Sequence, residues 1–507
     1  MSACSAPSEG PAAVKQGTER DTERDTVVLG LTVEHDSLNP ALGYAPDGGS
    51  LMYDGLVRRT PDLKLHPGLA ESLPEADGEE VTFKLRQGVK FHDGKELTSA
   101  DVVYTYEQVL KSANNSPIRG DYEFIDKVSA PDPRTVVFHL KHPYAAILQR
   151  TTLGIIPAGS DLSGDPVGTG PYTFVAWNKG EKVMLKANEG YWGEVPTVKN
   201  VVLAYTADDN ARASRMAAGE LTATVLPPKA AARFRNQPGM SVIEAPSADY
   251  RAIMFPLEQP VTGDLAIRRA LDLAVDRAAM VSAILAGAGN PGFGPVPAGT
   301  EWHNAAVRGS PDPDRAGAAK VLDEAGWKAG ADGIREKDGT PARFTLMYRA
   351  SDTLRKEIAL AVASDAKQVG IDIRLAGLDS DAIVPRLSKD ALVMGWGSPY
   401  DPDYTNYKLF HSSFAGQGYF NPGHLDDPAV DKALETARQS SDPVTRKKAY
   451  DMVQQRVDDN ATWLYLVYLK HVYVVRGNWT GLTPGVEAHE HATGGLLGTV
   501  VNWKPAQ

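Results

Sequence analysis

The chain has 507 residues, of which 42% are hydrophobic and 23% are charged, values that are ordinary for a globular protein. This length is too great for one hydrophobic core and predicts two or three domains. The 53 Lys and Arg and 64 Asp and Glu residues give a formal charge of −11, which argues against binding to nucleic acid or to an anionic membrane. No apolar run approaches the ~18 residues that a spanning helix needs.

A short polar segment opens the chain. Its Cys4, the single cysteine, follows small residues, as the lipid-modified cysteine does in a bacterial lipoprotein signal. The basic and apolar parts of such a signal do not stand before it, so Cys4 is either a lipid anchor or an ordinary thiol. Residues 5–25 are polar, contain Pro and Gly, and lack apolar periodicity. We therefore expect residues 1–25 to form a disordered tether.

Strand and helix patterns alternate along the rest of the chain, which predicts an α/β fold. The expected strands before a boundary near residues 247–256 are 26–33, 135–140, 168–183 and 198–205. After that boundary helix patterns dominate, at residues 265–286, 315–325, 352–370, 427–440 and 443–460. The strands expected between these helices are 344–347, 371–375 and 391–395, and residues 463–469 are expected to form a buried strand.

Residues 81–110 predict a strand, a tight turn and a helix in close succession. Apolar and polar residues alternate at the start, which is the period of a half-buried strand. The dipeptide Asp93-Gly94 indicates a turn, because Gly accepts a positive φ and Asp bonds to nearby backbone. Thr98 then caps a helix whose apolar residues recur at helical spacing. The segment contains no evident catalytic group.

This segment resembles the signature of the extracellular solute-binding proteins that serve peptide and nickel ABC importers. Further motifs of that family follow in the family's order and extend the resemblance from about Leu31 to the C-terminus. They are residues 167–172 (VGTGPY), 188–193 (NEGYWG), 266–271 (AIRRAL), 274–277 (AVDR), 322–327 (LDEAGW), 395–397 (GWG) and 421–422 (NP). A chance match to all of them in order is very improbable.

The resemblance implies a periplasmic-binding-protein-like α/β fold with two lobes, a central cleft and an inserted subdomain. Closure of the lobes about a hinge would enclose the ligand and exclude water. The expected divisions are 1–25 for the tether, 26–55, 165–250 and 473–507 for a discontinuous lobe I, 56–164 for the subdomain, and 251–472 for lobe II.

The sharpest candidate site is the loop at residues 395–404. It holds three aromatic residues, two carboxylates, two Gly and two Pro after an apolar strand. Such a loop is typical of the edge of a cleft, although it is also compatible with an ordinary loop whose Trp396 fills the core. The resemblance implies that the loop lines the ligand cavity. The residues expected to contact ligand are Trp396, Gly397, Ser398, Tyr400, Asp401, Asp403 and Tyr404.

Arg349 is the second candidate, because it follows a predicted strand and precedes a predicted helix. An Arg in this position can bind a carboxylate through two parallel hydrogen bonds, but a lone Arg is more often a solvated surface residue. The peptide-binding members of the family place an Arg at the matching strand end to hold the carboxylate of the ligand. The resemblance therefore implies the same role for Arg349.

The sequence departs from the dipeptide-binding members at the other end of the ligand. Their Asp, which pairs with the ligand's amino group, is replaced here by Tyr400, with Asp401 one residue further. The loop is more similar to that of the nickel-chelate members, which have a His later in the chain. The nearest His here is His411, fifteen residues after Trp396. The ligand therefore stays open between a peptide and a metal chelate.

Weaker site candidates follow from the resemblance alone. Tyr44 and Met52 stand in a loop that faces the cleft in the family. Arg119 could add a second positive group, although an exposed Arg at a helix end is the simpler interpretation. His489 and His491 share a face only on a strand and lack a third ligand, so we expect a chance cluster there and no metal site.

These observations predict a substrate-binding component of an ABC importer, which captures short peptides between two lobes and delivers them to a membrane permease. The first alternative is a nickel-binding or metal-chelate-binding protein of the same family. A secreted hydrolase is a distant third, because no GxSxG elbow, HExxH helix or P-loop is present. We expect no enzymatic activity, no cofactor, a monomer, and an extracytoplasmic location with a lipid anchor at Cys4.

Overall fold

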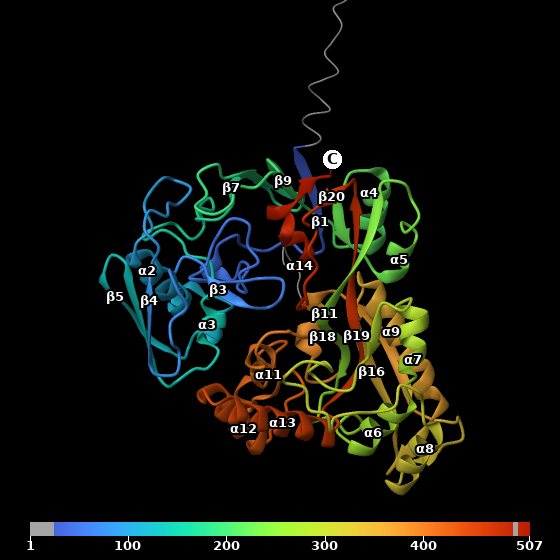
Figure 1. Ribbon diagram of the computed structural model, residues 1–507. Helices are drawn as coiled ribbons and strands as arrows, with labels where there is room; N and C mark the ends of the chain where they lie inside the picture. Colours follow the sequence, from blue (N-terminus) through green and yellow to red (C-terminus); the bar gives the residue numbers. More distant parts are fainter. Residues whose placement is uncertain (1–24, 490–494, 507) are drawn as a thin grey trace, which may run out of the picture.

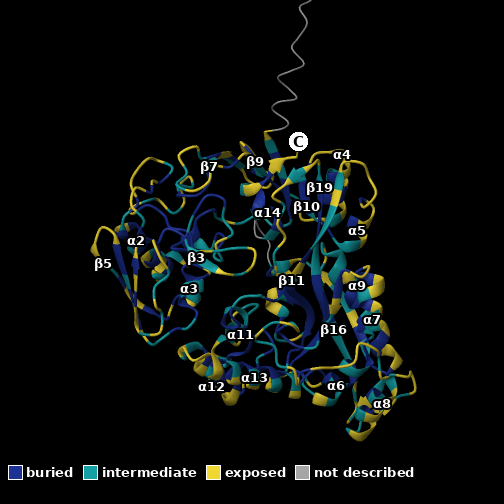
Figure 2. Cartoon of the chain, in the orientation of Figure 1, coloured by how far each residue is buried: buried dark blue, intermediate teal, exposed yellow. Residues whose placement is uncertain are grey.

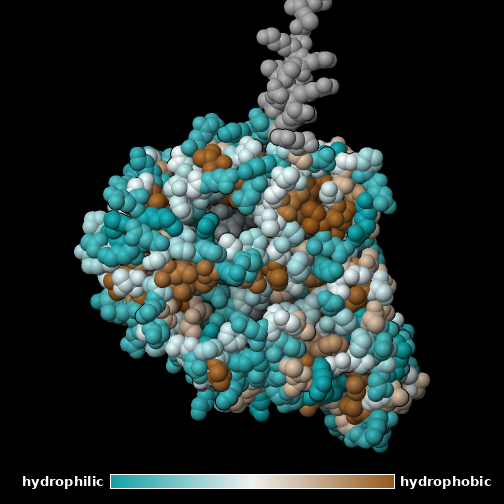
Figure 3. Space-filling view, viewed as in Figure 1, coloured by the Kyte–Doolittle hydropathy of each residue, from teal (hydrophilic) through white to brown (hydrophobic). Residues whose placement is uncertain are grey.

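The computed structural model describes residues 25–489 and 495–506. The chain forms two lobes and a subdomain, with the subdomain on the left, lobe I at the top and lobe II at the lower right of Figure 1. None of the described helices has both the length and the apolar character needed to cross a bilayer. Figure 3 shows a mostly hydrophilic face on which hydrophobic residues form separate patches.

One sheet of 11 strands runs through both lobes. Ten of them follow the order β17-β16-β18-β11-β19-β10-β1-β9-β8-β7, and β12 pairs with β19. In that order the strands are Asp372–Leu378, Arg343–Arg349, Ala391–Trp396, Met240–Met254, Trp463–Arg476, Ala223–Val225, Thr26–Leu31, Asn200–Tyr205, Lys182–Ala187 and Tyr172–Asn178, with β12 at Gly289–Pro291. The α/β class expected from the sequence is confirmed.

Thirteen α-helices are labelled in the described part of the chain. They are α2 Ser99–Leu110, α3 Ile147–Arg150, α4 Asp209–Ala218, α5 Pro228–Ala232, α6 Leu265–Ala274, α7 Arg277–Ala279, α8 Arg315–Glu324, α9 Thr353–Gln368, α10 Ser380–Ile383, α11 Asp403–Phe410, α12 Pro428–Gln439, α13 Pro443–Asp459 and α14 Gly495–Gly498. The single long helix expected over 265–286 is broken, because Val275 is extended and the carboxylate of Asp276 accepts a hydrogen bond from the backbone N–H of Ala279 to start α7.

Short strands complete the fold. They are β2 Val57–Arg59, β3 Leu65–Pro67, β4 Glu80–Lys84, β5 Ile125–Asp132, β6 Thr135–Leu140, β13 Lys328–Ala329, β14 Arg335–Lys337, β15 Thr340–Pro341, β20 Trp479–Thr480 and β21 Lys504–Pro505. The predicted strand, turn and helix of residues 81–110 are β4, a turn at Gly94 with φ of 85°, and α2. Strands β4, β6 and β5 form the sheet of the subdomain, and α2 packs on it.

Lobe II is a sheet with helices on both faces. Side chains of β18 alternate between its two cores: Ala391 and Val393 pack with α6, α8 and α9, whereas Leu392 and Met394 pack with α11, α12 and α13. Both faces of this strand are therefore buried, which explains its continuous apolar sequence. Figure 2 shows the corresponding buried layer beneath exposed outer helix faces.

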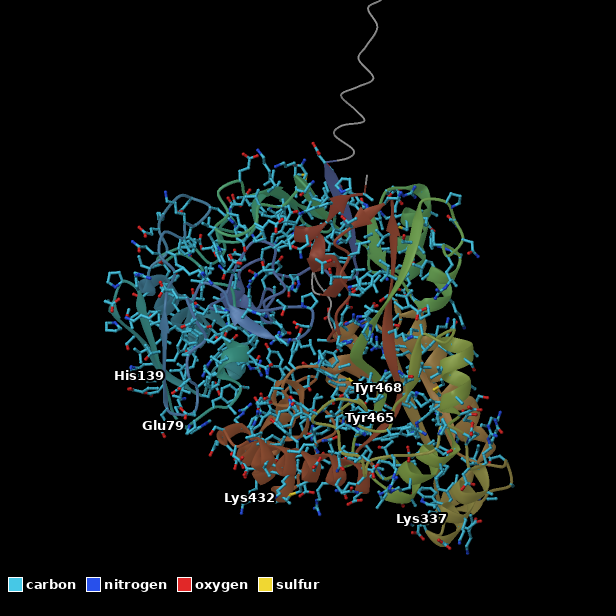
Figure 4. All side chains as sticks on the ribbon, viewed as in Figure 1. Glu79, His139, Lys337, Lys432, Tyr465 and Tyr468 are labelled. Atoms are coloured by element: carbon cyan, nitrogen blue, oxygen red, sulfur yellow. The ribbon has the colours of Figure 1, made fainter. Side chains whose placement is uncertain are left out.

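Strands β11 and β19 connect the lobes. Their register shifts between Pro246 and Tyr250, so residues 240–246 pair in lobe I and residues 250–254 pair in lobe II. The boundary expected near residues 247–256 therefore falls inside one continuous strand. On β19, Tyr465 and Tyr468 pack against the ring of Tyr250 and mark its lobe II part in Figure 4.

Candidate functional site

Two adjoining cavities lie between the lobes and share His489. The first, called the hinge cavity, is lined by the end of β1, by β11 and β19, and by the start of α9. The second, called the aromatic cavity, is lined by the loop after β18, by α11 and by the subdomain. Its aromatic lining residues are Tyr122, Trp396, Tyr404 and Phe420.

Arg349 and Trp396 are brought together by the sheet. Each is the last residue of its strand, and β16 and β18 are parallel neighbours with Leu346 opposite Ala391. Parallel strands end at the same edge of a sheet, and ligands of open α/β sheets bind at that edge. Arg349 lines the hinge cavity and Trp396 lines the aromatic cavity.

The Trp396 side chain has an unsatisfied polar group. Its indole nitrogen is buried and has no hydrogen-bond partner among the described residues, while its ring lies 6.0 Å from that of Phe420 and 6.5 Å from that of His489. A buried N–H without a partner costs free energy that a ligand carbonyl or carboxylate would recover.

Gly397 lets the loop approach β11 closely. Its φ is 132°, and a side-chain carbon there would lie 2.0 Å from the carbonyl oxygen of Ala248. The same residue accepts a hydrogen bond of 2.8 Å from the backbone N–H of His489. Only glycine fits this position, which fixes Trp396 and Ser398 at the wall of the aromatic cavity.

Tyr400 and Tyr404 hold the subdomain against lobe II. The guanidinium of Arg59 lies 3.4 Å from the ring centre of Tyr400, and that of Arg150 lies 3.8 Å from the ring centre of Tyr404. Tyr404 lines the aromatic cavity, whereas Tyr400 lines a separate groove beside residues 47–63. The structure thus places only one of the two tyrosines beside Trp396.

Asp401 and Asp403 are placed outside both cavities. Asp401 accepts hydrogen bonds from Arg446 at 2.6 Å and from the hydroxyl of Tyr450 at 3.1 Å. Asp403 accepts them from Arg438 at 2.8 Å and from the hydroxyl of Tyr144 at 2.6 Å. These buried carboxylates anchor α11 to α12, α13 and the subdomain, so we remove them from the proposed ligand contacts.

Four other sequence candidates also lie away from the two cavities. His411 stacks on Tyr407 with ring centres 4.7 Å apart and faces Asp431 and Glu435. The others are Tyr44 and Met52, which are buried in the core of lobe I, and Arg119, which is half-buried and paired with Glu123 at 3.3 Å. Cys4 lies outside the described residues.

Charged residues that the sequence did not indicate line the hinge cavity. Arg251 on β11 forms an ion pair of 2.5 Å with Asp249, and Arg355 on α9 pairs with Asp352. Arg349 forms no ion pair or side-chain hydrogen bond with any residue that the structure describes. The sequence offered one signal for this group: Arg251 stands inside the apolar end of β11, and a charged residue buried there requires a partner.

A buried network joins β11, β19 and the C-terminal segment next to the hinge cavity. His471 donates to Asp249 at 3.1 Å and to Glu487 at 2.6 Å, and His489 contacts Asp249 at 2.9 Å. Burial lowers the pKa of His471, but hydrogen bonds to Asp249 and Glu487 outweigh it and raise the pKa to about 10. Burial lowers the pKa of His489. His471 is therefore charged at neutral pH.

Direct contacts cross the space between the lobes. Lys408 of α11 pairs with Asp121 of the subdomain at 2.6 Å, and Arg150 lies 3.4 Å from the same carboxylate. On the other side, Lys229 of α5 pairs with Glu357 of α9 at 2.8 Å. Among the described residues, no group of three His, Cys, Asp or Glu side chains is arranged to hold a metal ion.

The fold and cleft define the class of two-lobed solute-binding proteins, and comparisons with known proteins identify the family. Residues 64–418 match the bacterial extracellular solute-binding proteins, family 5. Protein XP55 of Streptomyces lividans is 46% identical over 497 residues, which cover 96% of this chain and 90% of that protein. The chain belongs to family 5 of the bacterial extracellular solute-binding proteins.

Solved structures agree with this family. NikZ from Campylobacter jejuni, in complex with Ni(L-His), has a TM-score of 0.86 and 29% identity, and the match covers 95% of this chain and 99% of that one. The oligopeptide-binding protein AppA from Bacillus subtilis, in complex with a nonapeptide, has a TM-score of 0.82 and 26% identity, with the same coverage. The expected two-lobed binding-protein fold is confirmed.

Proposed function

We propose that this protein is the substrate-binding component of an ABC importer and that it captures short peptides between its two lobes for delivery to a membrane permease. The observation that supports the proposal is the position of Arg349 and Trp396 at one sheet edge between the lobes. Among the described residues, the guanidinium of Arg349 has no ion-pair partner and the buried indole N–H of Trp396 has no hydrogen-bond partner. A peptide has both the carboxylate and the backbone carbonyl groups that these two donors require.

Closure supplies the affinity in this mechanism. The contacts between Lys408 and Asp121 and between Lys229 and Glu357 join the two sides of the cleft, so a ligand between them is removed from water. Removal of water strengthens the interaction of Arg349 with a carboxylate, and Trp396 contributes apolar contact. Ligand binding therefore stabilises the closed form, and a permease can recognise that form.

A metal chelate is the second candidate, supported by the similarity to NikZ and its Ni(L-His) complex. Arg150 and Lys408 line the aromatic cavity together with Asp121, so an anionic chelator there would share these two cations with that carboxylate. Against it, His411 faces Asp431 and Glu435 instead of this cavity. A hydrolase has less support still, because the family consists of binding proteins of transporters. Intact recovery of bound peptide would argue against hydrolysis.

Native mass spectrometry of protein purified from its host tests the proposal. We expect the protein to carry a mixture of short peptides, each released intact by denaturation. Unfolded and refolded protein should then bind a synthetic tripeptide mixture in calorimetry without added nickel. Binding only after addition of Ni(II) and histidine would transfer the assignment to the metal chelate.

We further propose that the protein acts outside the cytoplasm as a monomer and is held at the membrane by a lipid on Cys4. The genomic region upstream should then encode, in frame, a basic and apolar leader. With that leader, the protein should partition into the membrane fraction, and Cys4→Ser should release it. Cytoplasmic residence of a chain that starts at Met1 would contradict this proposal.

A further inference from the structure

One residue stands at the junction of the hinge cavity and the aromatic cavity. Among the described residues, His489 is the single one that lines both. On the aromatic side, its ring centre lies 6.5 Å from that of Trp396. On the hinge side, its Nδ1 lies 2.9 Å from a carboxylate oxygen of Asp249. The imidazole ring therefore lies between the two cavities.

The protein holds His489 in this position from two sides. Its backbone N–H donates to the carbonyl oxygen of Gly397 at 2.8 Å, and its side chain contacts Asp249. Asp249 is itself fixed by Arg251 at 2.5 Å and by His471 at 3.1 Å. The side chain of His489 is only 11% exposed. The ring cannot leave the junction without breaking a buried hydrogen bond, which costs free energy.

The imidazole of His489 is an uncharged wall. Burial lowers its pKa, so the ring is neutral at pH 7. Burial raises the pKa of Asp249, but Arg251 and the two histidines outweigh it and hold that pKa well below its ordinary value. The ionised carboxylate can only accept a hydrogen bond, so Nδ1 of His489 carries the proton. A neutral, fixed ring discriminates between ligands by their size.

A ligand that uses both cavities must pass this ring. Arg349 lines the hinge cavity and Trp396 lines the aromatic cavity, so a peptide in contact with both has one part in each. A peptide advances about 3.5 Å per residue, so roughly one of its residues lies against the imidazole. A closed protein interior tolerates added volume poorly, and a bulky side chain at this point would overlap the ring.

We infer that His489 is a specificity-determining residue, which limits the size of the one ligand side chain that lies at the junction of the two cavities. Asp249 is the positioning residue that holds the imidazole there. This inference rests on the proposed function and extends it: the peptides are selected for a small residue, glycine or alanine, at one position.

The test uses immobilised full-length protein, freed of co-purified ligand by unfolding and refolding. It is offered equimolar alanine tripeptides in which one position at a time is glycine, leucine, phenylalanine or tryptophan, and the bound fraction is identified by mass spectrometry. We expect wild type to enrich glycine over tryptophan about tenfold or more at one position, the effect of forcing added volume into a packed interior.

Two variants separate size from hydrogen bonding. His489→Asn shortens the side chain but still has an N–H to donate to Asp249, and it should reduce the preference to about threefold or less. His489→Phe keeps a ring of similar size without the hydrogen bond, and the backbone bond to Gly397 remains. This variant should retain the preference for a small residue.

A histidine outside both cavities provides the matched control. His139 lies on β6 in the sheet of the subdomain (Figure 4) and lines neither cavity. His139→Asn should keep the wild-type preference. Melting temperature and circular dichroism establish that each variant is folded before its preference is compared.

The outcomes separate the two proposals. Capture of tripeptides with no size preference at any position, or an unchanged preference in His489→Asn, would overturn the role of His489 and leave peptide binding intact. Capture of no tripeptide by wild type would overturn both proposals. Loss of the preference in His489→Phe would show that the hydrogen bond to Asp249 selects the ligand, which contradicts a limit set by size.

Discussion

At the scale of single residues, the site is marked by two polar groups for which the described part of the chain provides no partner. Trp396 has a buried indole N–H, and Arg349 has a guanidinium with no partner among the described residues. A buried group such as the indole N–H of Trp396 is normally satisfied, because an unpaired one costs free energy, whereas the half-buried Arg349 can still bond to water. Their presence at neighbouring strand ends therefore indicates a place where a ligand completes the bonding.

Trp396→Ala should weaken ligand binding by about 2–4 kcal/mol, as expected for an aromatic residue at the centre of a binding site. Its effect on the free energy of unfolding should be smaller than that of a core tryptophan such as Trp503, which is fully buried. Calorimetry and denaturant unfolding measure the two effects. A large loss of stability with unchanged affinity would show that Trp396 belongs to the core.

Arg349→Ala should weaken the binding of a free-carboxylate peptide by about 2–5 kcal/mol. Amidation of the peptide should weaken wild-type binding and matter much less in the variant, because both changes remove the same charge pair. Calorimetry on the four combinations provides the coupling energy. Equal losses on amidation in both proteins would exclude contact between Arg349 and the carboxylate.

The raised pKa of His471 predicts a pH-dependent stability. A group whose folded pKa exceeds its ordinary value of 6.5 contributes fully below pH 6.5, and this contribution is lost as pH rises towards about 10. The difference in free energy of unfolding between wild type and His471→Gln should therefore shrink by a few kcal/mol from pH 6.5 to 9.5. Urea unfolding at both pH values measures it. A constant difference would mean that His471 is neutral.

At the scale of elements, α11 is fixed by the two carboxylates at its start. Asp401→Asn should lower the free energy of unfolding by about 3–5 kcal/mol, because it breaks a buried pair with Arg446. The exposed Asp426→Asn is the control and should change it by less than about 0.5 kcal/mol. Folded Asp401→Asn protein should bind ligand with nearly wild-type affinity, and a selective loss of affinity would return Asp401 to the site.

At the scale of the whole molecule, closure depends on pairs that join the lobes. Lys408→Ala leaves Asp121 with Arg150 alone, so it should favour the open form and weaken ligand binding about 10-fold or more. Small-angle scattering should show a larger radius of gyration for this variant at subsaturating ligand. Lys432→Ala, on the exposed face of α12, should behave like wild type. Equal compactness of the two variants would contradict the role of Lys408.

The local elements were predictable because their signals are local. Alternation in β4, the turn at Gly94 and the cap at Thr98 need no distant partner, and the same holds for α9, α12 and α13. The prediction of one helix over 265–286 is wrong, because the chain is extended at Val275 and the carboxylate of Asp276 starts a new helical turn. Short-range bonding of this kind competes with helical periodicity.

The candidate site was predictable only in part. The strand-end positions of Arg349 and Trp396 follow from sequence, because a strand followed by a Gly-rich or helical segment places its last side chain at the sheet edge. Asp401 and Asp403 look the same in sequence as ligand contacts, and only their distant partners Arg446 and Arg438 show that they are structural.

The sequence by itself determined the class, the family and the strand ends that carry Arg349 and Trp396, since these depend on periodicity and on ordered motifs. The tertiary structure decided which charged residues lie together in one cavity. Arg251 and Arg355 lie more than one hundred residues apart in the chain, and the missing side chain of Gly395 brings their guanidinium groups together. Charge compensation depends on distance in space, and sequence separation does not encode that distance.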